Sequence, residues 1–258
     1  MHLRCLLALV LAALLSACST PAHDRYPIPR LTDVDDWQPP DIETPEMPAV
    51  SGVAGGRSVT PAQLLQREIR VYPRLIQRGS YGRRYKRPMQ PRYITIHATE
   101  NRVGDAFAHA AALRNGRLRA NRRPGGNRIG FLTWHFTVQQ DLAVQHLPTR
   151  EQGEHADFDG PGNNYSIGIE MCEHRGNSLS ATIDRTAKLA AYLMYEHHIP
   201  LSHVVPHYHW PRHGLHPEHK NCPHFLLDNG RPGRKWAAFL NKVQAQYNRL
   251  VPGPAPQL

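Results

Sequence analysis

The sequence is short of cysteine, of acidic residues and of long apolar runs. Four cysteines in 258 residues, two of them within the first 18, exclude a small fold held together by disulfides. The apolar run at residues 6–15 is too short for a permanent membrane-spanning helix, which needs about 20 residues. Acidic residues number 21 against 31 Lys and Arg, a formal charge of +10, so we expect an acidic partner. No nucleic-acid-binding motif interleaves basic and aromatic residues, and we exclude nucleic acid as that partner.

Histidine, by contrast, is abundant. The chain has 17 histidines, and six of them lie between His207 and His224, which is more than packing requires. With 40% hydrophobic and 20% charged residues, the composition predicts one sizeable globular domain with unstructured ends.

The first 18 residues resemble a bacterial secretory signal. A positive charge at Arg4 precedes the apolar run, and residues 15–18, LSAC, resemble a lipobox. This resemblance implies that Cys18 becomes a lipid-modified N-terminus, so that acyl chains hold the protein at a membrane. Ser19 after the cysteine is associated with outer-membrane sorting, and we expect an outer-membrane lipoprotein that faces the periplasm. The alternative is an ordinary signal peptide with a chance cysteine.

Composition divides the rest of the chain. A Pro-rich stretch without apolar periodicity predicts a flexible tether, and the texture changes near Tyr93. We expect a signal peptide at 1–17, the tether at 18–58, a short helix and basic loop at 59–89, a catalytic domain at 90–250 and a disordered tail at 251–258. The basic residues at 83–87 are interpreted as part of a solvated loop.

Strand and helix patterns alternate within this domain. Short β-branched or aromatic segments bounded by turn residues predict strands at 93–96, 134–138, 143–147 and 166–171. Helical spacing of apolar residues predicts helices from Thr60 to about Tyr72, after Asp105 to Asn115, at 182–198 and at 236–250. Apolar helix faces of this kind cover a mixed sheet, which predicts an α/β domain.

Two histidines follow apolar segments that have the pattern of strands. His97 ends the segment RYITIH, and His207 follows residues 204–206; a rigid strand fixes the direction of the side chain after it. One such histidine alone is usually structural. Cys222 adds a third ligand, and a thiolate with two imidazoles makes a zinc site whose fourth position is open. The alternative for Cys222 is a disulfide with Cys172.

Six segments occur in the order and approximate spacing of a known family: YITIHATE, TWHFTVQQD, EHADF, NNYSIGIEM, VVPH and KNCP. Over about residues 90–230 the chain resembles the zinc-dependent N-acetylmuramoyl-L-alanine amidases, the amidase-2 group that includes phage T7-type lysozymes and peptidoglycan recognition proteins. The resemblance implies a central mixed β-sheet flanked by helices in a single catalytic domain.

The resemblance also implies the zinc ligands, which are His97, His207 and the cysteine of the K-x-C-P run, Cys222. A metal-ligating thiolate cannot also form a disulfide, so Cys172 is then expected to be a buried free thiol. The segment between His207 and Cys222 looks longer than in short-loop members, and its other histidines are competing ligands: His209, His213, His216 and His219.

The implied reaction is hydrolysis of the amide between N-acetylmuramic acid and the L-alanine of the stem peptide, by water that zinc activates near neutral pH. Glu170 is expected to act as general base and acid, because the tyrosine that serves some members is replaced here by Trp134. Lys220 is expected to stabilise developing negative charge. The alternatives are a structural Glu170 paired with arginine and a solvated Lys220.

The resemblance further suggests residues at or near the substrate: Trp134, His135, His155 and Asn163. His135 and His155 are expected either in the substrate groove or beside the metal ligands, and the alternative for both is a packed, half-buried histidine. The basic charge suits peptidoglycan or soluble muropeptides, whose peptides carry carboxylates, and we expect a monomer. Two other functions stay open, a non-catalytic peptidoglycan-binding protein on the same fold and a His-rich metal-binding lipoprotein.

Overall fold

The structure is a computed structural model and describes residues 59–120 and 129–251. The expectations for the signal peptide, the lipidated Cys18, the tether and nearly all of the tail lie outside these residues. Within them, no helix is both long enough and apolar enough to cross a membrane.

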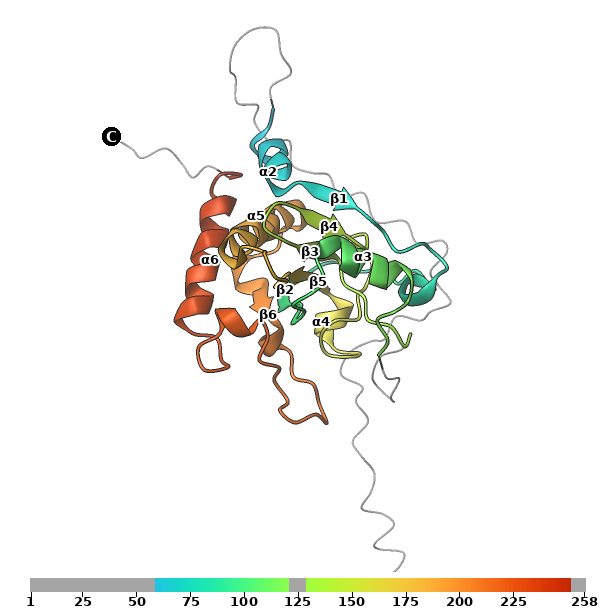
Figure 1. Ribbon diagram of the computed structural model, residues 1–258. Coiled ribbons are helices and arrows are strands. Elements are labelled where there is room, and N and C mark those ends of the chain that lie inside the picture. The colour runs from blue at the N-terminus through green and yellow to red at the C-terminus, as the bar shows by residue number, and fades with distance from the viewer. Residues whose placement is uncertain (1–58, 121–128, 252–258) are drawn as a thin grey trace, which may run out of the picture.

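A six-stranded mixed sheet forms the centre of the molecule (Figure 1). The strands lie in the order β1-β4-β3-β5-β2-β6. β3 and β4 are antiparallel, and the other neighbouring pairs are parallel. The strands are β1 (Val71–Pro73), β2 (Tyr93–Ala98), β3 (Phe136–Val138), β4 (Ala143–Gln145), β5 (Ser166–Met171) and β6 (Val204–Pro206).

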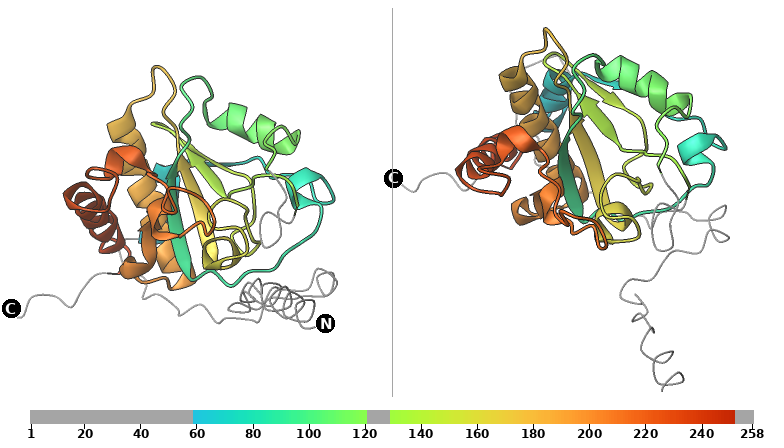
Figure 2. Two further views of the ribbon diagram at one scale, coloured as in Figure 1. Left: turned by 90° about the horizontal axis from the view of Figure 1, so that it is seen from below. Right: turned by 60° about the horizontal axis from the view of Figure 1, so that its bottom comes forward.

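Helices cover both faces of this sheet (Figure 2). Three of them share the main core on one face, and α3 packs on the other. The helices are α2 (Pro61–Ile69), α3 (Ala106–Arg114), α4 (Pro161–Asn164), α5 (Leu179–His197) and α6 (Arg234–Tyr247), with 3-10 turns at Tyr81–Arg83, Leu201–His203, His207–His209 and His224–Leu226. The expected α/β fold with a mixed sheet is confirmed.

Alternation along the two central strands separates core from site. Ile94 and Ile96 of β2 join Ile169 of β5 in the main core under α5 and α6. Successive strand side chains point to opposite faces, so His97 and Glu170, which are partners in the parallel register of β2 and β5, project to the other face. The sequence pattern therefore places these two polar side chains together, away from the main core.

The chain before residue 90 belongs to the same folded unit, which corrects the expected boundary. Leu65 and Ile69 of α2 are fully buried in the main core. The helix ends at Ile69, before the expected Tyr72, because Arg70 takes a left-handed conformation with φ of 57°. β1 then begins at Val71 and pairs with β4, and this long-range pairing overrides the helical pattern.

Composition predicts a solvated loop for the basic segment at 83–87, but two of its arginines form ion pairs with glutamates of the folded domain. Nη2 of Arg83 lies 2.7 Å from Oε1 of Glu151. Arg87 is 3% exposed and pairs with the equally buried Glu154. Buried charges are stable only when paired, so these two arginines connect the segment to the loop before α4.

Candidate active site

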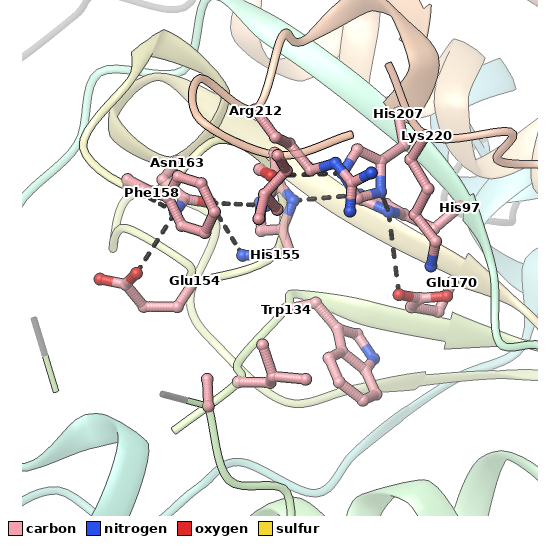
Figure 3. Close-up of a pocket in the computed structure, with 14 residues that line it drawn as sticks. His97, Trp134, Glu154, His155, Phe158, Asn163, Glu170, His207, Arg212 and Lys220 are labelled. Atoms are coloured by element: carbon pink, nitrogen blue, oxygen red, sulfur yellow. Dashed lines mark hydrogen bonds and ion pairs between the residues drawn. The ribbon is translucent and has the colours of Figure 1, made fainter. Parts of the chain in front are cut away.

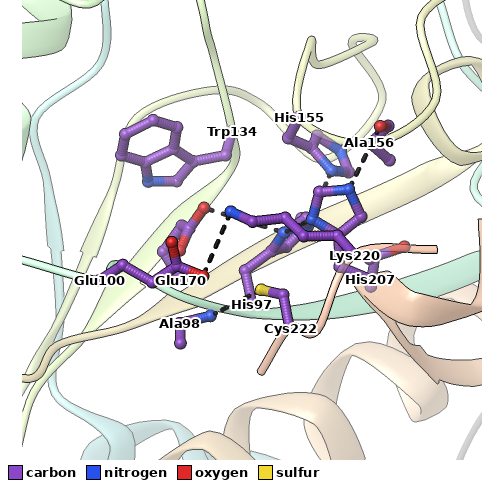
Figure 4. Close-up of polar contacts among 12 residues, drawn as sticks. His97, Ala98, Glu100, Trp134, His155, Ala156, Glu170, His207, Lys220 and Cys222 are labelled. Atoms are coloured by element: carbon purple, nitrogen blue, oxygen red, sulfur yellow. Dashed lines mark hydrogen bonds and ion pairs between the residues drawn. The ribbon is translucent and has the colours of Figure 1, made fainter. Parts of the chain in front are cut away.

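Two histidines and a cysteine meet at the carboxyl ends of β2 and β6. These strands are parallel neighbours, so His97 near the end of β2 and His207 directly after β6 lie side by side (Figure 4). One ligand atom each from His97, His207 and Cys222 lies within 4.8 Å of the others, and all three residues are buried. The backbone N–H of Ala98 donates to Sγ of Cys222 at 3.3 Å and fixes the position of the sulfur.

Burial sets the protonation state of this group. It lowers the pKa of His97 well below its usual value and that of His207 to about 3, and the nearby Lys220 contributes to both shifts. Burial also raises the pKa of the Cys222 thiol to about 12, with Glu170 adding to the rise. Without a cation, the group therefore consists of two neutral imidazoles and a thiol.

This donor set fits zinc, which prefers nitrogen and sulfur ligands in a tetrahedral arrangement. The Nδ1 atoms of His97 and His207 are 2.9 Å apart, close to the roughly 3.3 Å that two Zn–N bonds span at a tetrahedral ion. A small rotation of either imidazole ring would bring the two nitrogen atoms to that separation. A dication also deprotonates a coordinating thiol outright, which overcomes the raised pKa of Cys222.

Glu170 lies beside the three ligand atoms. Its Oε1 is 3.9 Å from Nδ1 of His97, and its Oε2 is buried without a hydrogen-bond partner among the described residues. Burial raises the pKa of this carboxyl to about 8, while Lys220 opposes the rise. A carboxyl group with this pKa can hold or release a proton near neutral pH, and perturbed groups of this kind are typical of active sites.

Lys220 approaches the same group from the loop before Cys222. Its Nζ is 3.3 Å from Oε1 of Glu100, a partner that the sequence did not suggest. The side chain is 34% exposed and lines the pocket, so the ammonium group is held at the edge of the site without being sealed inside it.

A pocket of about 310 Å³ opens over these residues (Figure 3). His97, His207 and Glu170 line it. Its other polar lining includes two cations, Arg212 and Lys220. The apolar side chains of the lining are Ala120, Leu132, Trp134, Ala156, Phe158 and Leu215.

Comparison with known proteins identifies the family of this chain and agrees with its fold. A family model described as N-acetylmuramoyl-L-alanine amidase matches residues 87–225, more than half of the chain. The chain belongs to this amidase family. It is 37% identical over 161 residues to the N-acetylmuramoyl-L-alanine amidase CwlH of Bacillus subtilis, covering 61% of this chain and 54% of that one. It is 40% identical over 143 residues to XlyA of the same organism, covering 54% and 42%. The chain thus spans about half the length of these curated relatives.

Solved structures of the family have the same fold. A mutant endolysin from Bacillus subtilis matches with 36% identity and a TM-score of 0.56, covering 68% of this chain and 99% of that one. The catalytic domain of XlyA matches with 36% identity and a TM-score of 0.55 over the same shares.

Of the four residues expected at or near the substrate, Trp134, His155 and Asn163 line the pocket and His135 does not. The ring of His135 is fully buried and both nitrogens are engaged: Nε2 lies 2.7 Å from the carbonyl of Glu151, and Nδ1 accepts from the N–H of Gly168 at 3.0 Å. The structure therefore favours the alternative for His135, a packed histidine outside the pocket.

Asn163 lines the pocket, but its amide serves the protein. Oδ1 accepts from the N–H groups of His155 and Ala156, both at 2.8 Å. Nδ2 donates to the carbonyl of Phe158 at 2.6 Å and to Oε2 of Glu154 at 3.2 Å. The amide has no group left over for the expected substrate contact.

The competing histidines of the long loop lie apart from the ligand group, which among the described residues contains none of them. Nδ1 of His213 lies 2.7 Å from Oε1 of Glu218, and Nδ1 of His219 donates to the carbonyl of Tyr208 at 2.7 Å. The remaining two competing histidines, His209 and His216, are also absent from the ligand group among the described residues. The same loop supplies Arg212 to the pocket, a residue that sequence reasoning missed although its position between two ligand residues was a usable signal.

Cys172 is a buried free thiol, as is Cys222. Burial raises the pKa of Cys172 far above its usual value, so the thiol is inert. The expectation that these two cysteines do not pair is confirmed.

Proposed function

We propose that this protein is a zinc-dependent peptidoglycan hydrolase that cleaves the amide between N-acetylmuramic acid and the L-alanine of the stem peptide. The observation that carries the proposal is the buried group of His97, His207 and Cys222 with the carboxyl of Glu170 beside it at the base of a pocket. Membership of the amidase family supports the choice of bond.

His97, His207 and Cys222 would hold the metal. When bound, zinc supplies Lewis-acid chemistry, because it polarises a carbonyl oxygen and lowers the pKa of water to about 7. Glu170 takes up the proton of the attacking water at its unpartnered Oε2 and returns it to the leaving nitrogen. Burial raises the pKa of this carboxyl in the metal-free protein and a bound dication lowers it, and the two opposing effects suit a group that has to accept and return a proton near the working pH.

Two cations and a hydrophobic wall would bind the substrate. Lys220 and Arg212 line the pocket, and their positive charges attract the carboxylates of stem peptides. Lys220 also stabilises negative charge that develops on the attacked carbonyl oxygen. Trp134 offers an apolar ring, because its indole N–H already donates to Oγ1 of Thr137 at 2.8 Å.

We further propose that the protein works as a monomer tethered to the outer membrane through a lipidated Cys18 and faces the periplasm. The lipobox-like residues 15–18 and the Pro-rich stretch that follows support this location, which would bring the site to peptidoglycan.

The proposal is tested with protein that lacks the first 18 residues, incubated with intact peptidoglycan and with defined muropeptides. We expect mass spectrometry to detect free stem peptides, their release to stop after chelation and to return with zinc, and Glu170→Gln to bind zinc without releasing them. Release that persists after exhaustive chelation would refute the metal mechanism. Peptidoglycan binding without release would favour the non-catalytic alternative, and several tightly bound metal ions per chain without release would favour the metal-binding one.

A further inference from the structure

The two histidine ligands have a second set of contacts, on the ring nitrogens that point away from the metal group. Nε2 of His97 lies 3.0 Å from Nδ1 of His155, and Nε2 of His155 lies 3.3 Å from the carbonyl oxygen of Ser166. Nε2 of His207 lies 3.2 Å from the carbonyl oxygen of Ala156. Both outer contacts therefore lead to the adjacent residues His155 and Ala156.

The two carbonyl groups favour one placement of the ring hydrogens when a cation occupies the site. A carbonyl oxygen only accepts, and a neutral imidazole has one N–H and one lone pair. Facing Ser166, His155 carries its hydrogen on Nε2 and has an acceptor at Nδ1. That acceptor places the hydrogen of His97 on Nε2 and leaves a lone pair on Nδ1.

The same reasoning applies to His207, whose Nε2 donates to the carbonyl of Ala156. Both Nδ1 lone pairs then face each other across 2.9 Å. Two facing lone pairs repel each other, and a cation ligated by both removes the repulsion. His207 faces a carbonyl oxygen, which can only accept a hydrogen bond. His97 instead faces the side chain of His155, which accepts at Nδ1 in only one of its two tautomers.

The ring of His155 is fixed by the surrounding backbone. A Cβ at Gly168 of β5 would lie 2.9 Å from atoms of this ring, and one at Gly153 would lie 2.5 Å from it. These glycines give the imidazole room to lie against the backbone. Oδ1 of Asn163 holds the N–H groups of both His155 and Ala156, so a single amide fixes the two acceptors together.

We infer that His155 is a positioning residue, which holds His97 in the tautomer whose Nδ1 can ligate zinc, and that Asn163 holds the backbone that carries both outer acceptors. This inference rests on the proposed zinc site. It selects, of the two positions expected for His155, the one beside the metal ligands, and it gives Asn163 a supporting role in place of a peptide contact. Outer partners of metal ligands commonly contribute 10- to 100-fold in metal affinity.

The first test measures zinc affinity by competition with a chromogenic chelator. His155→Phe fills the space of the ring but offers no acceptor, and we expect about 10- to 100-fold weaker zinc binding. His155→Gln offers an amide oxygen to Nε2 of His97 and should recover part of the loss. His135→Phe is the matched control, because this buried ring lies 6.0 Å from that of His155 between centroids and bonds to other backbone groups; it should leave zinc affinity unchanged.

The second test needs no variant. Nitrogen-15 NMR of histidine side chains in the zinc-loaded parent protein should show the hydrogen of His155 on Nε2 and a lone pair on its Nδ1, which faces Nε2 of His97. A hydrogen on Nδ1 of His155 in the zinc-loaded protein, or unchanged zinc affinity in a folded His155→Phe variant, would overturn the inference and leave the proposed function intact. A parent protein that binds no zinc would overturn both.

Discussion

Replacing Glu170 by glutamine should separate catalysis from stability. The substitution keeps the shape of the side chain but removes its charge and its ability to exchange a proton. We expect the rate of amide cleavage to fall by about 10²-fold or more, the usual contribution of a general acid–base group. The metal-free protein should at the same time become more stable, because a buried carboxylate without a partner is costly.

The magnitude follows from the pKa of Glu170, which burial raises from 4.5 to about 8 in the folded protein. Between these two pH values the folded state binds more protons than the unfolded state, so the carboxyl group costs stability as pH rises through this range. Each pKa unit corresponds to 1.36 kcal/mol, which sets an upper limit of about 5 kcal/mol above pH 8. The side chain is 14% exposed, and solvent screening reduces the expected gain in free energy of unfolding to ~2–4 kcal/mol.

Urea unfolding in the presence of chelator, at pH 4 and at pH 9, measures this effect. The advantage of Glu170→Gln over the parent should be near zero at pH 4 and largest at pH 9. Glu68→Gln is a control of opposite sign, because its hydrogen bond to Arg249 lowers the pKa of Glu68 to about 2; this variant should be the less stable one at pH 9. A Glu170→Gln advantage that does not change with pH, or a loss of stability at pH 9, would refute the account of Glu170 as a buried, uncompensated carboxyl.

Three further predictions concern the ligands, the pocket and acid stability. Cys222→Ser should abolish stoichiometric zinc binding in a metal-content assay, whereas retained zinc would mean that a loop histidine is the third ligand. Arg212→Gln should raise KM about 10-fold for stem peptides with free carboxylates, in line with the loss of one charged hydrogen bond, and should hardly change it for amidated ones. Burial lowers the pKa of His135 to about 4 and of His146 to about 3, so stability that is present above pH 6.5 should be lost as pH falls towards 3; an unfolding free energy that stays constant from pH 7 to pH 4 would contradict this.

The central strands and the ligand group could be predicted from the sequence because the information is local. His97 lies near the end of an apolar strand, and the parallel neighbouring strand β6 ends just before His207. Parallel pairing of the two strands therefore brings the two histidines together. Glu170 is in register with His97 for the same reason.

Long-range contacts account for what could not be predicted. β1 has only three residues, too few for a periodic signal, and its pairing with β4 joins segments about 70 residues apart. The partner of Arg87 lies 67 residues away, and nothing near Arg87 in the sequence indicates that its charge is buried. His155 and Asn163 were expected at or near the substrate because their motif pointed to the site, but only the orientation of the imidazole and the amide shows that they contact the protein itself.

The position of α2 and β1 affects how the domain can be isolated. β1 lies at the edge of the sheet and covers β4, and unpaired strand edges promote aggregation. A fragment restricted to the family match at residues 87–225 would expose this edge. It would also lose Leu65 and Ile69 of α2 and Phe239 and Val243 of α6, which all belong to the main core. The segment that defines the family is therefore smaller than the unit that folds.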